Sequence, residues 1–158
     1  MNLDLIHATQ AYKEVIANLM QLYMYDFSVY IEMDVEEDGL FKAYAGLEDY
    51  WKDSVHKFPY LIRKEDKWVG FVLVQLLPSP QEHYSIAEFF VLQKYRRGGI
   101  GRTAAKRVFD LHKGQWLVHQ RETNHPAQAF WRKVIHEYTK GRFLDRFEKG
   151  RRVQSFKN

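Results

Sequence analysis

One stretch constrains the fold of this chain more than any other: a hydrophobic strand that runs through a basic, glycine-rich turn into a helix. Residues 86–92 are apolar, β-branched and aromatic, which predicts a buried strand. Ile100, Ala104, Val108 and Leu111 then recur at helical spacing. The turn holds three glycines and three arginines, namely Gly98, Gly99, Gly101, Arg96, Arg97 and Arg102. Glycines let a ligand approach the backbone, and a helix N-terminus attracts anions, so this turn predicts a phosphate or pyrophosphate site.

The length of the chain limits how many domains it can form. Its 158 residues, of which 46% are hydrophobic, predict one domain over residues 1–158 with ample material for a core. No apolar run approaches the roughly 20 residues that a membrane helix needs. The start at Met1-Asn-Leu-Asp4 lacks the features of a signal sequence. We therefore expect a cytoplasmic protein that is not associated with a membrane.

The composition also limits the chemistry. The sequence has no cysteine, which excludes disulfides, cysteine metal sites and a cysteine-bound covalent intermediate. Its seven histidines show no paired ligand spacing, so we expect no metal. A net charge of +4 favours anionic ligands, and nucleic acid stays among the alternatives at this point.

The first half of the chain predicts a strand, two helices and three further strands. Residues 3–8 form a candidate strand, and apolar residues at helical spacing follow up to Phe27, with Thr9 as the expected helix cap. Residues 47–56 indicate a weaker helix. The strands expected next are residues 60–63, 68–77 and 84–92, the first two joined by a tight turn. Their short connections predict antiparallel pairing.

The second half predicts a different connection. Gly114 ends the helix that follows the glycine-rich turn, and residues 115–119 form a further strand, so this unit alone should be parallel. Asn124 and Pro126 begin the next helix. Residues 139–145 and 151–156 suggest a closing hairpin with a basic rim.

The glycine-rich turn could also belong to one of two other phosphate-binding motifs. The run from Gly99 to Ala104 fits the short dinucleotide fingerprint, and Glu122 lies about 20 residues further on. That fingerprint opens a doubly wound parallel sheet, whereas antiparallel strands precede this turn and too few residues follow it. A nucleotide-triphosphate loop fails because the required lysine with a following Ser or Thr is absent. A plain turn without a ligand stays as a minor alternative.

These residues resemble the GNAT superfamily of acyl-CoA-dependent N-acetyltransferases. The signature of that family is Arg or Gln, two residues, Gly, one residue, and Gly or Ala, and residues 96–101 match it. The run Glu88-Phe-Phe-Val91 and the helix after the turn are similar to the fourth strand and third helix of the family. Asn124, Ala127 and Phe130-Trp131 match its Asn, Ala, hydrophobic, Tyr pattern except at the last position.

The resemblance implies a fold and an acyl donor. The fold is α+β, an α/β/α sandwich in which a mixed, mainly antiparallel sheet of about seven strands is flanked by about four helices. The donor is acetyl-CoA, with its pantetheine arm along the splayed end of the fourth strand and its pyrophosphate on the backbone N–H groups of residues 97–102. The cofactor-binding residues implied are Phe89, Phe90, Val91, Arg96, Arg97, Gly98, Gly99, Ile100, Gly101, Arg102, Asn124 and Trp131. Asn124 has a second interpretation as a helix cap, and it can serve both roles.

The chemistry implied by the resemblance is direct attack of an amine on the thioester in a ternary complex. Glu88 stands where some members of the family carry a carboxylate base, and a buried carboxylate has a raised pKa suited to that role. Its alternative is a salt bridge to an arginine. Trp131 occupies the position of the family's tyrosine acid, and an indole cannot release a proton at working pH. Water or another tyrosine, among Tyr23, Tyr30, Tyr84 and Tyr138, remains open as the acid.

The sequence says least about the residues that bind the acceptor. Asp26, Tyr30 and Asp34 lie where the family places its substrate-binding helices, and acidic and aromatic groups suit a cationic amine. A solvated loop is the competing interpretation. Besides the acetyltransferase, an acyl-CoA-binding sensor without transfer and, last, a nucleic-acid-binding protein remain alternatives. The acceptor, the acyl-chain preference and the choice between monomer and homodimer stay open.

Overall fold

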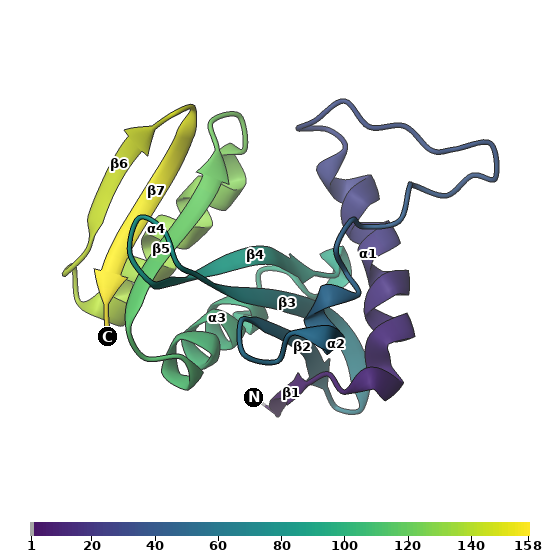
Figure 1. Cartoon of the computed structure of the whole chain (residues 1–158), viewed down its shortest axis with the longest axis horizontal. Coiled ribbons are helices and arrows are strands. Elements are labelled where there is room, and N and C mark those ends of the chain that lie inside the picture. Colours follow the sequence, from purple (N-terminus) through teal and green to yellow (C-terminus); the bar gives the residue numbers. More distant parts are fainter. Residues whose placement is uncertain (1) are drawn as a thin grey trace.

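The order of helices and strands is the one that the sequence predicts. The structure, a computed structural model, describes residues 2–158 (Figure 1). Its strands are β1 (Leu3–His7), β2 (Lys57–Lys64), β3 (Lys67–Leu77), β4 (His83–Val91), β5 (Gln115–Arg121), β6 (Leu144–Glu148) and β7 (Arg151–Lys157). Its α-helices are α1 (Lys13–Phe27), α2 (Asp49–Lys52), α3 (Ile100–Leu111) and α4 (His125–Thr139).

All seven strands belong to one sheet. Their order across it is β1-β2-β3-β4-β5-β7-β6. The pairs β1/β2, β2/β3, β3/β4, β5/β7 and β6/β7 are antiparallel, and β4/β5 is parallel. The predicted single parallel unit is therefore confirmed, with α3 as its crossover helix.

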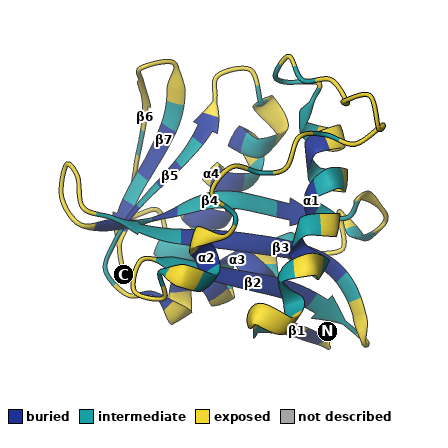
Figure 2. Ribbon diagram, turned by 45° about the vertical axis from the view of Figure 1, so that its right-hand side comes forward, coloured by how far each residue is buried: buried dark blue, intermediate teal, exposed yellow. Residues whose placement is uncertain are grey.

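Helices cover both faces of the sheet. Ile16, Met20 and Met24 of α1 and Tyr50 of α2 belong to a buried cluster on one face. Residues of α3 and α4, among them Val108 and Ile135, form the larger cluster on the other face. The central strands β2 and β3 are buried from both sides (Figure 2). The α+β sandwich expected from the resemblance is thus confirmed.

The expected start of the first helix is wrong. Thr9 makes no capping hydrogen bond with its side chain. Residues Gln10–Tyr12 form a 3₁₀ turn instead, and α1 begins at Lys13. Such a turn is a frequent lead-in to an α-helix, and it satisfies the first N–H groups without a side-chain cap.

Two other predicted boundaries also differ. The helix expected over residues 47–56 is confined to α2, because Asp53 leaves helical geometry and its carboxylate accepts the N–H of His56. The strand expected at residues 139–145 starts later, because α4 runs to Thr139 and ends with Lys140 and Gly141 at φ of 55° and 82°.

Candidate active site

The three glycines in the turn from β4 to α3 differ in what the fold demands of them. Gly99, the N-cap residue of α3, has a φ of 84°, which disfavours any side chain. A Cβ on Gly101 would lie 3.3 Å from the ring of Phe130 on α4. Gly98 has neither constraint: its φ is not positive and open space surrounds the position of a Cβ. The fold therefore does not explain Gly98, whereas close approach of a ligand to the backbone would.

The same turn presents free backbone donors. The first hydrogen bond of α3 runs from the N–H of Thr103 to the carbonyl of Gly99 at 3.0 Å. The N–H groups of Ile100, Gly101 and Arg102 precede it and have no carbonyl inside the helix to reach. Arg97 is left-handed at a φ of 66°, and successive N–H groups around such residues form a concave anion site. These donors are compatible with the predicted phosphate site, which stays a prediction.

The three arginines of the turn differ in what they contact. Arg96 donates from Nε to the carbonyl of Val91 at 2.8 Å, and its Nη2 lies 2.7 Å from Oδ2 of Asp26 on α1. Arg102 lies 3.6 Å from Glu137 of α4, a carboxylate that Lys106 approaches to 3.0 Å. Arg97 is exposed. Arg97 is thus available to an anion, Arg102 shares the carboxylate of Glu137 with Lys106, and Arg96 ties the turn to α1.

Strands β4 and β5 separate soon after they meet. Their register contains the single pair Tyr84 and Trp116, and beyond it the strands diverge (Figure 1). The N–H of Leu92 donates to Val69 on β3, so the alternation of an antiparallel ladder directs the N–H of Val91 towards the β5 side. Within residues 2–158, no strand pairs with Val91 on that side. This free edge matches the expected place of the pantetheine arm.

A β-bulge directs Glu88 to the α1 side of the sheet. Leu73 of β3 lies opposite Glu88 but Val74 lies opposite Ile86, which leaves Ala87 as the extra residue. Ile86 and Phe89 pack in the cluster under α3 and α4. Ala87 packs in the cluster under α1, and Glu88 meets tyrosines from that same side. Without the extra residue the period of two would turn Glu88 to the opposite face.

Two tyrosine hydroxyls enclose the carboxylate of Glu88. Tyr23 of α1 donates to Oε2, and Tyr44 of the loop before α2 donates to Oε1 at 3.1 Å. Burial raises the pKa of Glu88, which the two hydrogen bonds and the charge of Arg121 partly oppose. Burial and the neighbouring carboxylate raise the pKa of both tyrosines, so their protons stay on the hydroxyls. The salt bridge weighed as the alternative role of Glu88 is not formed within residues 2–158.

Sequence reasoning missed Tyr44. It comes from an irregular segment without periodicity, and no local pattern distinguishes it from the other tyrosines. Gln21 of α1 holds this segment, since its amide donates to the carbonyl of Phe41 at 2.9 Å and accepts the N–H of Phe41 at 2.8 Å. The segment is therefore fixed against α1 where Tyr44 approaches Glu88.

Trp131 and Asn124 both lie on the α4 side of the splayed strands. The indole of Trp131 is buried and packs edge-on against Phe89 of β4, with ring centroids 5.0 Å apart. Asn124 caps α4, its side chain accepting the N–H of Ala127 at 3.2 Å. The cap interpretation of Asn124 is confirmed, and its contact with a cofactor stays a prediction.

The other tyrosines considered as acids lie elsewhere. Tyr138 donates to Asp110 at 2.9 Å and accepts from Asn158 at 3.1 Å, at the far end of α4. Tyr84 packs among His112 and Trp116. Tyr30 lies on the segment after α1, with its ring 6.0 Å from that of Phe27. Among these candidates, Tyr23 is the one hydrogen-bonded to Glu88.

The residues expected to bind the acceptor are not gathered at one point. The carboxylate of Asp26 is engaged by Arg96. Tyr30 and Asp34 lie on the segment between α1 and α2, where Asp34 is exposed. The structure brings Tyr23 and Tyr44, rather than these three residues, against Glu88.

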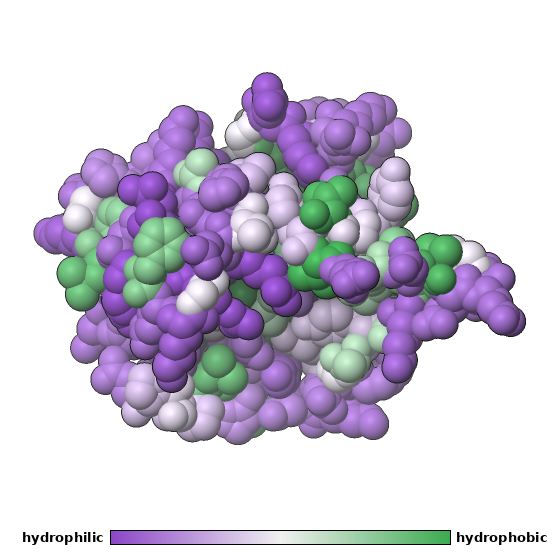
Figure 3. All heavy atoms as spheres, turned by 90° about the horizontal axis from the view of Figure 1, so that it is seen from above, coloured by the Kyte–Doolittle hydropathy of each residue, from purple (hydrophilic) through white to green (hydrophobic). Residues whose placement is uncertain are grey.

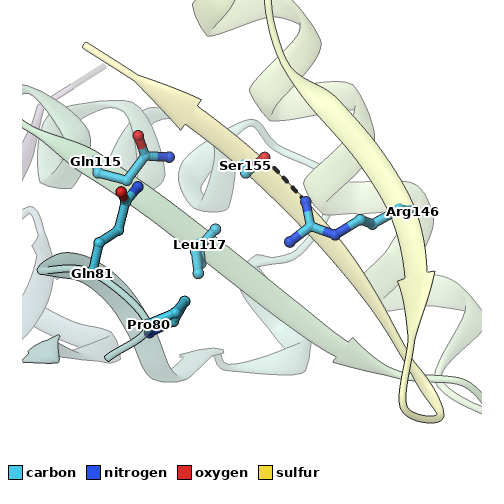
Figure 4. A pocket seen from close by; sticks show the side chains of 6 residues that line it. All are labelled: Pro80, Gln81, Gln115, Leu117, Arg146 and Ser155. Carbon is cyan, nitrogen blue, oxygen red and sulfur yellow. Dashed lines mark hydrogen bonds between the residues drawn. The ribbon is translucent and has the colours of Figure 1, made fainter. Parts of the chain in front are cut away.

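A shallow depression of about 230 Å³ lies apart from these groups. It is formed by Pro80 and Gln81 before β4 together with Gln115 and Leu117 of β5, and it is closed by Ser155 and Arg146 (Figure 4). Nη1 of Arg146 donates to the hydroxyl of Ser155 at 3.3 Å. Its lining holds no carboxylate, histidine, cysteine or lysine.

Neither a metal site nor a membrane span is present among residues 2–158. No cluster of three or more metal-ligating side chains occurs there, and no helix is both long and apolar enough to cross a membrane.

Comparison with known proteins agrees with this geometry. A family model described as Acetyltransferase (GNAT) family matches residues 16–136, more than half of the chain. A search of curated proteins finds no match.

Solved structures resemble the whole chain. An acetyltransferase from Thermus thermophilus has a TM-score of 0.71 at 15% identity, covering 100% of this chain and 98% of its own. The PaiA N-acetyltransferase from Thermoplasma acidophilum, in complex with coenzyme A, has a TM-score of 0.65 at 10% identity and full coverage of both chains. Spermidine N-acetyltransferase from Vibrio cholerae, in complex with CoA and spermine, has a TM-score of 0.60 at 14% identity, covering 98% of this chain and 93% of its own. At such identities the likeness shows the fold alone.

Proposed function

Because the chain belongs to the acetyltransferase (GNAT) family, we propose that it transfers an acetyl group from acetyl-CoA to an amine. The amine nitrogen attacks the thioester carbonyl carbon while both substrates are bound, the carbon–sulfur bond breaks, and the products are an amide and the CoA thiol. The observation that carries the proposal is the meeting of three features at one place. These are the free N–H edge of β4, the free N-terminus of α3 and the buried carboxylate of Glu88.

Acetyl-CoA takes its place along the gap between β4 and β5. The backbone N–H groups of residues 97–102 hold the pyrophosphate, supported by Arg97 and Arg102. Pantetheine runs beside Phe89, Phe90 and Val91, in contact with Trp131. The N–H of Val91 donates to the thioester oxygen and stabilises the negative charge that develops there. Support comes from the unexplained Gly98, whose lack of a side chain leaves room for the phosphates.

Glu88 removes the proton from the attacking amine. Its raised pKa makes the carboxylate a stronger base than an exposed glutamate, and Tyr23 and Tyr44 hold it in a fixed orientation. Each carboxylate oxygen accepts one tyrosine hydroxyl and keeps a further lone pair for the substrate.

The CoA thiolate leaves without a side-chain acid and takes its proton from the bulk solvent, because the pKa of a thiol, about 8.5, lies above neutral pH. Trp131 cannot release its indole proton at working pH, and the raised pKa values of Tyr23 and Tyr44 make both hydroxyls weaker acids than a free tyrosine. Proton transfer from either to a thiolate, whose conjugate acid has a pKa of about 8.5, is therefore uphill.

The acceptor enters from the α1 side of the sheet, on which Tyr23, Tyr44 and Glu88 lie. Tyr30 and Asp34 of the segment after α1 are the proposed outer contacts. Asp26 remains a candidate only if its pairing with Arg96 opens. A structural neighbour that is a spermidine N-acetyltransferase bound to spermine is compatible with an amine acceptor, although at 14% identity it does not define one.

A sensor that binds acyl-CoA without transfer is the second candidate. The observation that favours it is Trp131, which fills the position of the family's acid with a side chain that packs into the core.

The test measures thiol release from acetyl-CoA over a panel of amines, alongside calorimetric binding of acetyl-CoA. We expect release with at least one amine, and a fall of about 10² or more in kcat for Glu88→Gln with unchanged acetyl-CoA affinity. Binding without release for every amine would favour the sensor. Loss of both would contradict the proposed cofactor site.

A further inference from the structure

Two arginines on neighbouring strands lie directly opposite each other. Arg121 ends β5 and Arg151 begins β7, and the two are register partners in that antiparallel pair. Side chains of such partners lie on the same face of the sheet, and like charges there destabilise the pair. Neither guanidinium forms a hydrogen bond or an ion pair within residues 2–158. An anion between them would relieve this repulsion.

This face of β5 and β7 looks towards α1. The guanidinium carbon of Arg121 lies 5.9 Å from the ring centroid of Phe27, at the end of α1. Phe27 stacks on Tyr23 at 5.5 Å, and Tyr23 donates to Glu88. A continuous series of side-chain contacts thus connects Arg121 to the proposed base. Viewed from above, where α1 and β5 end, the surface is mostly hydrophilic (Figure 3).

The other charged groups on this face leave it positive. Glu148 is the register partner of Arg151 in the β6/β7 pair, but its carboxylate accepts from Nε of Arg146 at 3.0 Å. His119 lies two residues before Arg121, and burial, followed by the charge of Arg151, lowers its pKa. His119 is therefore neutral at physiological pH. Glu88 also faces Arg121, whose charge lowers the pKa of that carboxyl without forming an ion pair, so the guanidinium groups of Arg121 and Arg151 stay unpaired within the described part of the chain.

We propose that Arg121 and Arg151 bind an anionic group of the acceptor, so that the acceptor is an amine that also carries a carboxylate. The proposal rests on the proposed function, because the amine must reach Glu88. A guanidinium fork matches a carboxylate in shape and charge, and charge-assisted bonds of this kind are the strong ones. The acidic residues 32–38 would attract a polycation, whereas these arginines select an acceptor with both charges.

The test compares paired acceptors. Each ω-amino acid, from glycine to 6-aminohexanoate, is matched with its carboxamide, which has the same amine and chain but no negative charge. We expect wild-type kcat/KM to be at least about tenfold higher for the acid of the best-fitting length. Arg121→Gln and Arg151→Gln should each bring the acid-to-amide ratio towards one, by raising KM for the acid. Arg142→Gln, an exposed arginine beyond α4, is the matched control and should keep the ratio.

Several outcomes would overturn the proposal. Equal kcat/KM values for acids and amides in the wild type would overturn the carboxylate site but leave the proposed acetyl transfer intact. A loss of acetyl-CoA affinity in Arg121→Gln would also overturn the carboxylate site. Preference for an aminoalkyl phosphate over the amino acid of equal length would replace the carboxylate by a phosphate and contradict the stated class. Absence of transfer to every amine would overturn the proposed function together with this inference.

Discussion

The hydroxyl of Tyr44 donates a 3.1 Å hydrogen bond to Oε1 of Glu88, across 44 positions of sequence. Tyr44 belongs to the irregular segment between α1 and α2, and Glu88 to a bulged position of the central strand β4. With Tyr23 on the other oxygen, the carboxylate is removed from water but not left without partners. Such an arrangement stabilises the ionised carboxylate less than water does, which suits a base.

The first prediction concerns stability against pH in Glu88→Gln. The folded-state pKa of Glu88 lies above its ordinary value of 4.5, so the native state holds this proton to higher pH than the unfolded chain. Raising the pH through that window therefore lowers the free energy of unfolding of the wild type, and glutamine abolishes this loss. The stability of Glu88→Gln relative to wild type should rise with pH from about 4.5 upward and then level off.

Urea unfolding at a series of pH values measures this difference. The exposed Glu82→Gln provides the matched carboxyl-to-amide control. A relative stability of Glu88→Gln that falls with pH would contradict the raised pKa.

The second prediction concerns Gly98→Ala. Since open space surrounds this position and its φ is not positive, the fold accepts a methyl group. The free energy of unfolding should therefore change by no more than about 0.5 kcal/mol. Affinity for acetyl-CoA should nevertheless fall, because the methyl group occupies the space in which the pyrophosphate approaches the backbone. Calorimetric titration with CoA measures this affinity. Unchanged affinity in both Gly98→Ala and Gly98→Val would show that no ligand approaches here.

Gly99→Ala provides the contrast. A side chain at a φ of 84° costs about 1–2 kcal/mol, so this variant should lose stability by that amount. The two variants thereby distinguish a glycine that the backbone conformation requires, Gly99, from one that ligand binding requires, Gly98.

The third prediction concerns Asp26→Asn. Because Asp26 is half-exposed and pairs with Arg96, its loss should cost less than about 1 kcal/mol in unfolding free energy. If the pairing persists during turnover, KM for the amine should stay within about twofold of wild type. Steady-state kinetics and urea unfolding measure the two quantities. A tenfold rise in KM with unchanged stability would instead restore Asp26 as an acceptor-binding residue.

The fourth prediction concerns Trp131→Phe. The variant keeps an aromatic ring against Phe89 but removes the indole N–H, and it should lose about 1 kcal/mol of stability. Its kcat should change far less than the roughly 10²-fold that a general acid contributes. Single-turnover rates at saturating acetyl-CoA measure this. A loss of that size in a stably folded variant would mean that the indole N–H assists the leaving thiolate.

Much of the fold could be predicted because its signals are local. Short connections predicted the antiparallel strands around Trp68 and Tyr84, and the glycine-rich turn predicted the strand-to-helix connection before Ile100. Errors arose where the local signal was weak. Asp53 ended α2 by a side-chain bond that competes with the helix, and α4 continued to Thr139 because its apolar face packs on the sheet.

The sequence by itself determined the order of the elements, the candidate anion site at Gly98 to Arg102 and the candidacy of Glu88, since each depends on residues adjacent in the chain. Tertiary structure alone decided which groups surround Glu88, that Arg96 pairs with Asp26, and that Arg121 lies opposite Arg151. Those contacts join residues distant in sequence. A single extra residue at Ala87 changes the face that Glu88 takes, and sheet register, which no local pattern encodes, determines where that residue falls.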